Sequence, residues 1–231
     1  MGQMIGLIGA MDEEIRLLLD GMEDRKTVTK AGTDYFTGIV KGKSVVVCKS
    51  GVGKVNAAVT AQILADTFQV SSVLFTGVAG ALHPNLEIGD IVISSECMQH
   101  DMDATALGFA RGVIPYQEVS CFPADSALVA LAEQACLELD VAHMTGTILS
   151  GDRFIADPLE AASLHEQMGG LCTEMEGAAV AQVCYMNNVP FAILRAMSDK
   201  ADGSAHVNFA EFTVASSLRS HMILEAMLDL M

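Results

Sequence analysis

The chain has 231 residues, of which 51% are hydrophobic, and a formal net charge of −16 at pH 7. Because single cores grow to about 250 residues, we expect residues 1–231 to form one domain. Nucleic-acid binding is excluded, since phosphate backbones require clustered Lys and Arg and the 13 basic residues here are scattered. The balance of charge and hydropathy favours a metabolic enzyme with a small-molecule substrate.

The lack of a recognisable targeting signal and the pattern of the cysteines both predict a cytoplasmic protein. No apolar run approaches the roughly 20 residues of a membrane span. The short apolar run near the N-terminus ends in three acids and lacks the basic start of a signal peptide. The six cysteines show no CxxC spacing and lie mostly in apolar segments, which is typical of reduced, buried thiols. We therefore expect a cytoplasmic protein without membrane attachment.

The first part of the chain alternates apolar runs with amphipathic stretches. Residues 4–10 predict a buried strand, and the stripe of Ile15, Leu18, Leu19 and Met22 predicts a helix. Further on, the pattern predicts two strands of a hairpin, a helix and two buried strands: residues 35–40, 44–49, 55–68, 73–76 and 91–94.

The second part begins with a stretch of no clear period, residues 98–121, which predicts a long functional loop. Asp157-Pro158 predicts a helix start with an Asp cap and proline at the first position. The remaining elements are expected as strands at residues 147–149, 172–175 and 191–197, and as helices at residues 128–136, 178–186 and 212–222.

Alternating strands and helices predict an α/β fold with a twisted, mixed, largely parallel central sheet covered by helices. Sites in such folds lie at the carboxyl ends of strands. Three of the expected strands end in polar or glycine-rich segments, which are residues 9–14, 77–80 and 198–199. These ends are the first candidates for a functional site.

Two short motifs suggest chemistry that their surroundings do not support. Gly51-Val52-Gly53-Lys54 resembles part of a P-loop, but that motif requires glycine at position 48 and Ser or Thr at position 55, where this chain has Cys48 and Val55. His100-Asp101-Met102-Asp103 could belong to a metal site, yet no second cluster supplies the three or four ligands needed. We interpret it as a solvated or hydrogen-bonded loop, and we expect neither metal nor cofactor.

Six stretches resemble the bacterial 5'-methylthioadenosine/S-adenosylhomocysteine nucleosidases, within the nucleoside phosphorylase fold family. They lie in that family's order and spacing: residues 6–14 (GLIGAMDEE), 50–54 (SGVGK), 76–80 (TGVAG), 150–154 (SGDRF), 174–177 (EMEG) and 194–199 (LRAMSD). The resemblance implies a nucleoside phosphorylase-like domain. It also implies hydrolysis of the N-glycosidic bond of methylthioadenosine and S-adenosylhomocysteine, which gives adenine and the 5-thio-ribose product.

The resemblance also implies roles for three carboxyl groups. Cleavage of an N-glycoside passes through an oxocarbenium-like state, so the base should leave protonated and water should attack the opposite face of the sugar. Asp199 matches the acid at purine N7, and Ser198 the residue that holds it. Glu176 matches the acceptor of the ribose hydroxyls. Glu14 matches the group that activates water, with Arg195 nearby.

Further residues match the family's binding pocket. Adenine is expected between Phe154 and the backbone around Ile155, with the remaining matches at Met11, Val52, Val78, Ala79, Gly80, Glu174, Met175 and Phe209. This chain has Val78 where many members carry serine, and Leu107 where many carry phenylalanine. Leu107 and Pro115 would come from a neighbouring subunit, so the resemblance implies a homodimer.

Other interpretations remain open. Asp199 could be a helix cap, Glu174 and Glu176 could be an exposed acidic strand end, and Glu14 could be an ordinary first-turn acid. A nucleoside phosphorylase would share the fold, but the acids of residues 12–14 would repel phosphate. A binding module without catalysis is a further alternative. A hydrolase of another nucleoside, such as 5'-deoxyadenosine or futalosine, is the last.

Overall fold

The computed structural model describes residues 3–200 and 205–231, with side chains described up to residue 200 and again from residue 212. Strands and helices alternate in the expected order. They are β1 (Ile5–Gly9), α1 (Asp12–Asp20), β2 (Glu23–Lys30), β3 (Thr33–Val40), β4 (Lys43–Lys49), α2 (Lys54–Asp66), β5 (Ser72–Ala81), β6 (Ile91–Gln99), a 3₁₀ turn (Thr105–Leu107), β7 (Cys121–Pro123), α3 (Ser126–Glu138), β8 (His143–Ser150), α4 (Pro158–Met168), β9 (Gly170–Glu174), α5 (Gly177–Asn187), β10 (Phe191–Asp199) and α6 (Ala205–Leu230).

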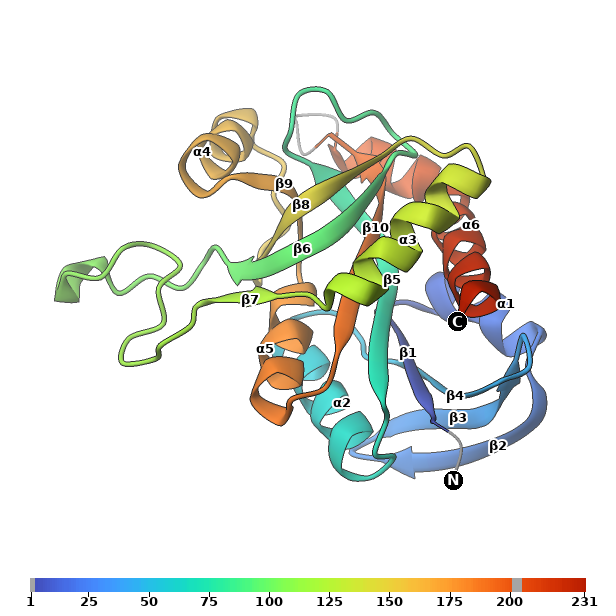
Figure 1. Ribbon diagram of the computed structural model, residues 1–231. Coiled ribbons are helices and arrows are strands. Elements are labelled where there is room, and N and C mark those ends of the chain that lie inside the picture. The colour runs from blue at the N-terminus through green and yellow to red at the C-terminus, as the bar shows by residue number, and fades with distance from the viewer. Residues whose placement is uncertain (1–2, 201–204) are drawn as a thin grey trace.

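The strands form one mixed sheet, part of which closes into a small barrel (Figure 1). Strands β4, β1, β5 and β10 are parallel neighbours at its centre. Antiparallel pairs join β2, β3 and β4 into a meander. The barrel closes because β5 also pairs with β9, and β6 pairs with both β8 and β10. The predicted α/β fold with a mixed sheet is confirmed.

Helices cover both faces of the sheet because its central strands are apolar on both sides. Adjacent residues of a strand point to opposite faces. Leu7 and Val47 therefore pack in one hydrophobic cluster with side chains of α1, α3 and α6, whereas Ile8 and Val46 pack in a second cluster with side chains of α2 and α5. Burying each such side chain stabilises the fold by about 1.5–3 kcal/mol. This double burial explains why these strands appear as continuous apolar runs in the sequence.

Three strands differ most from the expectation: β2 and the short β7 were not predicted, and β5 is longer than predicted. Strand β2 was not predicted, because all of its residues are exposed and its charged sequence, EDRKTVTK, has no apolar face. Such charges are typical of an edge strand, where they discourage pairing with other chains. Strand β5 does not end at Thr76 but continues through Gly77–Gly80 to Ala81, entirely buried. The glycines that suggested the end of a strand therefore lie within one.

The connections hold two expected features. Asp157 caps α4 by accepting hydrogen bonds from the amides of Leu159 and Glu160, and Pro158 begins the helix. Residues 100–120 form a long segment that extends away from the body of the molecule and contains only the short 3₁₀ turn (Figure 1). Over the residues that the structure describes, no helix is both long enough and apolar enough to span a bilayer.

Candidate active site

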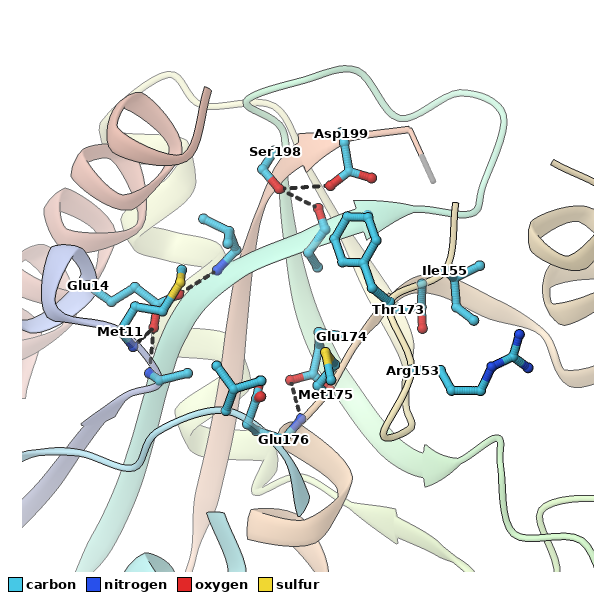
Figure 2. A pocket seen from close by; sticks show the side chains of 16 residues that line it. Met11, Glu14, Arg153, Ile155, Thr173, Glu174, Met175, Glu176, Ser198 and Asp199 are labelled. Carbon is cyan, nitrogen blue, oxygen red and sulfur yellow. Dashed lines mark hydrogen bonds between the residues drawn. The ribbon is translucent and has the colours of Figure 1, made fainter. Parts of the chain in front are cut away.

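A pocket opens where β1, β5, β9 and β10 reach their carboxyl ends, the position expected for a site in an α/β fold (Figure 2). Its volume is about 600 Å³ including the open mouth, which falls within the usual 300–1,000 Å³ of small-molecule sites. The lining residues are Ala10, Met11, Glu14, Val52, Val78, Ala79, Gly80, Arg153, Phe154, Ile155, Thr173, Glu174, Met175, Glu176, Ser198 and Asp199.

Most of the predicted site residues therefore meet in this one pocket, and a few do not. Arg195 is not among the lining residues but is buried behind them. Leu107 and Pro115 lie on the extended segment and do not line the pocket of their own chain. The side chain of Phe209 lies outside the described residues. Three lining residues, Ala10, Arg153 and Thr173, were not predicted. Ala10 and Arg153 lie within stretches that carry the resemblance, so their neighbours in the sequence were the signal that could have identified them.

Glu14 reaches the pocket from the first turn of α1 and is only 3% exposed. Its carboxylate accepts hydrogen bonds from the backbone amides of Ala10, Met11 (3.0 Å) and Val78 (3.2 Å). Burial raises the pKa of Glu14, and the Arg195 guanidinium and these amides offset only part of that effect. A raised pKa makes this carboxylate a better proton acceptor than an exposed one.

Two glycines allow Glu14 to lie this close to the strands. A Cβ added to Gly77 of β5 would come within 2.8 Å of Glu14 Oε1 and 3.1 Å of Arg195 Nη1. A Cβ on Gly9 would lie 2.8 Å from Glu14 Cβ and 2.7 Å from a methyl group of Ile15. Both positions thus require a residue without a side chain, because the Glu14 carboxylate lies against Gly77 and the Glu14 Cβ and the Ile15 methyl group lie against Gly9.

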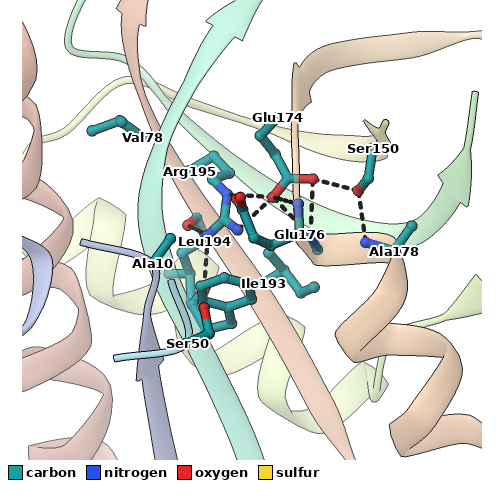
Figure 3. Close-up of polar contacts among 12 residues, drawn as sticks. Ala10, Ser50, Val78, Ser150, Glu174, Glu176, Ala178, Ile193, Leu194 and Arg195 are labelled. Atoms are coloured by element: carbon teal, nitrogen blue, oxygen red, sulfur yellow. Dashed lines mark hydrogen bonds and ion pairs between the residues drawn. The ribbon is translucent and has the colours of Figure 1, made fainter. Parts of the chain in front are cut away.

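Glu174 is the last residue of β9, and its carboxylate binds several hydrogen-bond donors of the protein (Figure 3). Its carboxylate forms an ion pair with Arg195 Nη2 at 2.6 Å and accepts a hydrogen bond from the Ser150 hydroxyl. It also accepts from the amides of Glu176 (3.2 Å) and Gly177 (2.8 Å), at the N-terminus of α5. A carboxylate at this end of a helix is stabilised by the helix dipole. Glu174 therefore fixes the bend that follows the strand.

The strand ends at residue 174, one residue earlier than predicted, and Met175 and Glu176 line the pocket beyond that bend. Glu176 is buried and accepts a hydrogen bond from the amide of Gly53 at 2.8 Å. Burial, and next the negative charge of Glu174, raise the pKa of Glu176 to about 8. A positive charge on a bound ligand would favour the ionised form of this group.

Asp199 lies on the opposite wall, at the end of β10, and is buried. The Ser198 hydroxyl donates a hydrogen bond to Asp199 Oδ2 at 3.0 Å, which orients the carboxyl group. Phe154 and Ile155 line the same pocket (Figure 2). Three carboxyl groups from three different elements thus surround one largely apolar cavity, an arrangement that can supply an acid, a base and a counter-charge.

Among the described residues, no three His, Cys, Asp or Glu side chains are arranged to hold a metal ion. His100 is buried, and its ring lies against Gly151, where an added Cβ would come within 2.5 Å of it. Asp101 instead forms an ion pair with Lys54. The metal-like motif at residues 100–103 is thus part of a hydrogen-bonded loop, as interpreted from the sequence.

Comparisons with known proteins agree with this geometry. The family model of the phosphorylase superfamily matches residues 4–229. A 5'-methylthioadenosine/S-adenosylhomocysteine nucleosidase of Bacillus cereus (strain G9842) is 42% identical over 219 residues, which cover 94% of each chain. The crystal structure of the nucleosidase of that name from Neisseria meningitidis, in complex with methylthio-immucillin-A, has a TM-score of 0.95 and 36% identity, and the match covers 99% of this chain and 100% of that one.

A futalosine hydrolase of Helicobacter pylori strain 26695 is also similar, with a TM-score of 0.94 and 35% identity, and the match covers 99% of this chain and 98% of that one. Fold alone therefore does not separate the two activities. The family model, which matches residues 4–229, spans all the residues that line the pocket, and the Bacillus cereus nucleosidase matches 94% of this chain at 42% identity. The chain belongs to the 5'-methylthioadenosine/S-adenosylhomocysteine nucleosidases, N-glycosyl hydrolases of the phosphorylase superfamily.

Proposed function

We propose that this chain hydrolyses the N-glycosidic bonds of 5'-methylthioadenosine and S-adenosylhomocysteine, releasing adenine and the 5-thio-ribose product. The observation that carries the proposal is the set of three buried carboxyl groups, Glu14, Glu176 and Asp199, around one apolar pocket. The relatives that carry this name support the choice of substrates.

Asp199 acts at the base. Adenine is a poor leaving group as an anion, so protonation at N7 lowers the barrier to departure. The hydrogen bond from Ser198 holds the carboxyl group in one orientation. Phe154 and Ile155 flank the purine, and the backbone of Ile155 offers an amide and a carbonyl to its polar edge.

Glu176 and Glu14 act at the sugar. Glu176 accepts hydrogen bonds from the ribose hydroxyls, and its charge stabilises the oxocarbenium-like transition state. Met175 packs on the sugar. Glu14, with a pKa raised by burial, takes a proton from the water that attacks the anomeric carbon. Arg195 is 1% exposed and forms an ion pair with Glu174. Its positive charge offsets part of the negative charge that Glu14, Glu174 and Glu176 would carry when ionised.

Water rather than phosphate is the nucleophile in this proposal, for an electrostatic reason. Backbone amides at the start of a helix normally bind anions, but here the amides of Ala10, Met11 and Val78 already donate to Glu14. A phosphate would have to displace this carboxylate from its backbone donors. Phosphorolysis is therefore disfavoured.

We propose in addition that two chains form a homodimer. Leu107 is 71% exposed on a segment that extends away from the body of the molecule, where it can reach a second subunit. Leu107 and Pro115 would then close the partner's pocket over the 5' substituent.

We also propose a cytoplasmic location, since all six cysteines are free and five are buried.

A substrate panel tests the proposed function. Release of free base is followed with methylthioadenosine, S-adenosylhomocysteine, 5'-deoxyadenosine and futalosine as substrates. We expect kcat/KM to be highest for the two thio-nucleosides, because many of the residues that line the pocket are apolar. A preference for futalosine by more than tenfold would instead support the activity of the Helicobacter pylori relative.

A further inference from the structure

The P-loop-like motif at residues 51–54 and the metal-like motif at residues 100–103, whose Lys54 and Asp101 have no role in the proposed chemistry, contact one another. Lys54, the lysine of the P-loop-like sequence, forms an ion pair between Nζ and Asp101 Oδ1 at 2.5 Å, and it also donates to Gln99 Oε1 at 3.0 Å. The two charged side chains are largely buried, with exposed fractions of 17% and 22%. Lys54 and Asp101 therefore neutralise each other's charge.

A third residue closes a ring of hydrogen bonds. Asp101 Oδ2 accepts from the amide of Asp152 at 2.9 Å, and Asp152 Oδ1 accepts from the amide of Lys54 at 2.8 Å. Gly53 permits the close approach, since its φ is +97° and an added Cβ would lie 3.2 Å from Asp152 Oδ1. We call these three residues the Lys54–Asp101–Asp152 ring. It joins the start of α2, the end of β6 and the loop after β8.

The charges within the ring are matched. Burial alone would raise the pKa of Asp101, but the hydrogen bonds from Lys54 and from the Asp152 amide outweigh this effect and lower the pKa. Asp101 is therefore ionised at neutral pH. Hydrogen bonds between ionised partners are shorter and stronger than neutral ones, so the ring firmly connects the start of α2 to the loop after β8. That loop also contacts the end of β6 through the hydrogen bond from the His100 amide to the Ser150 carbonyl.

Each segment joined by the ring carries part of the pocket. Phe154 and Ile155 follow Asp152 by two and three residues and line the pocket. On the α2 side, Val52 lines the pocket and the Gly53 amide donates to Glu176. Beneath the loop, the buried ring of His100 packs against Gly151, and neither of its nitrogens has a hydrogen-bond partner among the described residues. Residues 151–155 are thus held both by the ring and by this packing.

We propose that Lys54 and Asp101 are positioning residues that hold the base-binding wall, residues 152–155, in the conformation that receives the substrate. The wall's contact with the purine rests on the proposed function. Asp101 also begins the extended segment at residues 100–120, so the same pair connects one subunit's pocket with the segment that would reach its partner. Neither side chain lines the pocket, so both act through Asp152 and Gly53.

Steady-state kinetics of Lys54→Met and Asp101→Asn test the proposal, with Lys54→Arg as the conservative variant. Loss of the pair should raise KM for methylthioadenosine about tenfold, equivalent to about 1.4 kcal/mol, and change kcat by less than about threefold. Lys54→Arg should restore most of the affinity, because a guanidinium can also donate to Asp101. The double variant should be no worse than either single one.

A second ion pair near the pocket provides the matched control. Lys49 Nζ lies 2.8 Å from Asp12 Oδ2, but these side chains are 43% and 78% exposed. Exposed pairs contribute about 0–1 kcal/mol, so Lys49→Met should leave KM unchanged. An equal rise in KM for Lys49→Met and Lys54→Met would overturn the proposal, because a general loss of positive charge would then explain both.

Hydrogen exchange separates this inference from the proposed function. The amides of residues 151–155 should exchange faster in Lys54→Met and Asp101→Asn than in the wild type, and at the wild-type rate in Lys49→Met. This result does not depend on which nucleoside is cleaved. Unchanged exchange, or a fall in kcat at constant KM, would contradict a positioning role. Asp101→Asn is nearly isosteric and keeps the test open if Lys54→Met does not fold.

Discussion

Glu14, Glu174 and Glu176 are buried near one another, and among the described residues Arg195 is the one buried Lys or Arg side chain. Glu174 forms an ion pair with that cation and accepts hydrogen bonds from the amides at the start of α5. Glu14 and Glu176 are left with backbone amides as their main partners, and burial raises the pKa of both. This difference in partners explains how neighbouring carboxyl groups can have different roles, a structural one for Glu174 and a chemical one for Glu14 and Glu176.

Substitution of the three pocket carboxyl groups tests the roles proposed for them. Asp199→Asn and Glu14→Gln should each lower kcat by roughly 10²–10⁴, the usual contribution of a positioned acid or base. Glu176→Gln should also lower kcat strongly, because its interaction grows with the charge on the sugar. Asp12→Asn, an exposed acid of the same helix turn as Glu14, is the control. A variant that retained more than about a third of wild-type turnover would show that its role is wrongly assigned.

The raised pKa of Glu176 also affects stability. Its pKa rises from 4.5 to about 8 on folding, so the folded state binds the proton more tightly. The stability that this group contributes is complete below pH 4.5 and is lost as the pH rises through about 8. Glutamine keeps an acceptor for the Gly53 amide without a charge. The melting temperature of Glu176→Gln, relative to wild type, should therefore increase from pH 5 to pH 8, whereas Glu138→Gln on the surface should show a constant difference. A constant difference for both would contradict the effect of burial.

The residues of the site could be predicted from the sequence more completely than the groups with which they form hydrogen bonds. Glu14, Glu176, Ser198 and Asp199 were predicted from the resemblance and lie in one pocket. The hydrogen-bonding role of Glu174 could not be predicted, because it depends on a bend after β9 that brings Arg195 and the start of α5 together. The same holds for the ring of Lys54, Asp101 and Asp152, whose members are far apart in the chain.

At the scale of elements, buried strands and amphipathic helices were recognised because each has an apolar face with a fixed period. Strand β2 has no such face, so its place at the edge of the sheet depends on pairing with β3 alone. The length of β5 was underestimated because glycine usually ends a strand. Close packing by Glu14 and Arg195 replaces the missing side chain at Gly77, and this is visible only in three dimensions.

Gly77→Ala tests how tightly β5 packs on α1, the helix that carries Glu14. Its Cβ would lie 2.8 Å from Glu14 Oε1, so the carboxylate or the strand must move. We expect overpacking to cost about 1–3 kcal/mol in the free energy of unfolding and kcat to fall at least tenfold, since Glu14 is displaced. Gly21→Ala, whose Cβ would meet only the Leu17 carbonyl at 3.6 Å, is the control. Wild-type kcat in folded Gly77→Ala would contradict the need for this close contact.

At the scale of the whole molecule, Leu107 provides a test of the proposed dimer. If it covers the 5' substituent in the partner's pocket, Leu107→Ala should lower kcat/KM for methylthioadenosine about fivefold, from 30–40 Å² of lost apolar contact at about 25 cal/mol per Å². The value for 5'-deoxyadenosine should change little, because this nucleoside has little to cover. Equal losses for the two substrates would mean that residue 107 does not contact the 5' group, and the two-subunit pocket would have to be abandoned.

The choice of water over phosphate as the nucleophile decides whether this chain is a hydrolase. It is tested by the identity of the sugar product when methylthioadenosine is cleaved in buffer with excess inorganic phosphate and a metal chelator. Because Glu14 occupies the amides that would bind phosphate, mass spectrometry should detect free methylthioribose, formed at the same rate with and without phosphate. Methylthioribose 1-phosphate as the main product, or adenine release that requires phosphate, would contradict hydrolysis and identify the chain as a phosphorylase.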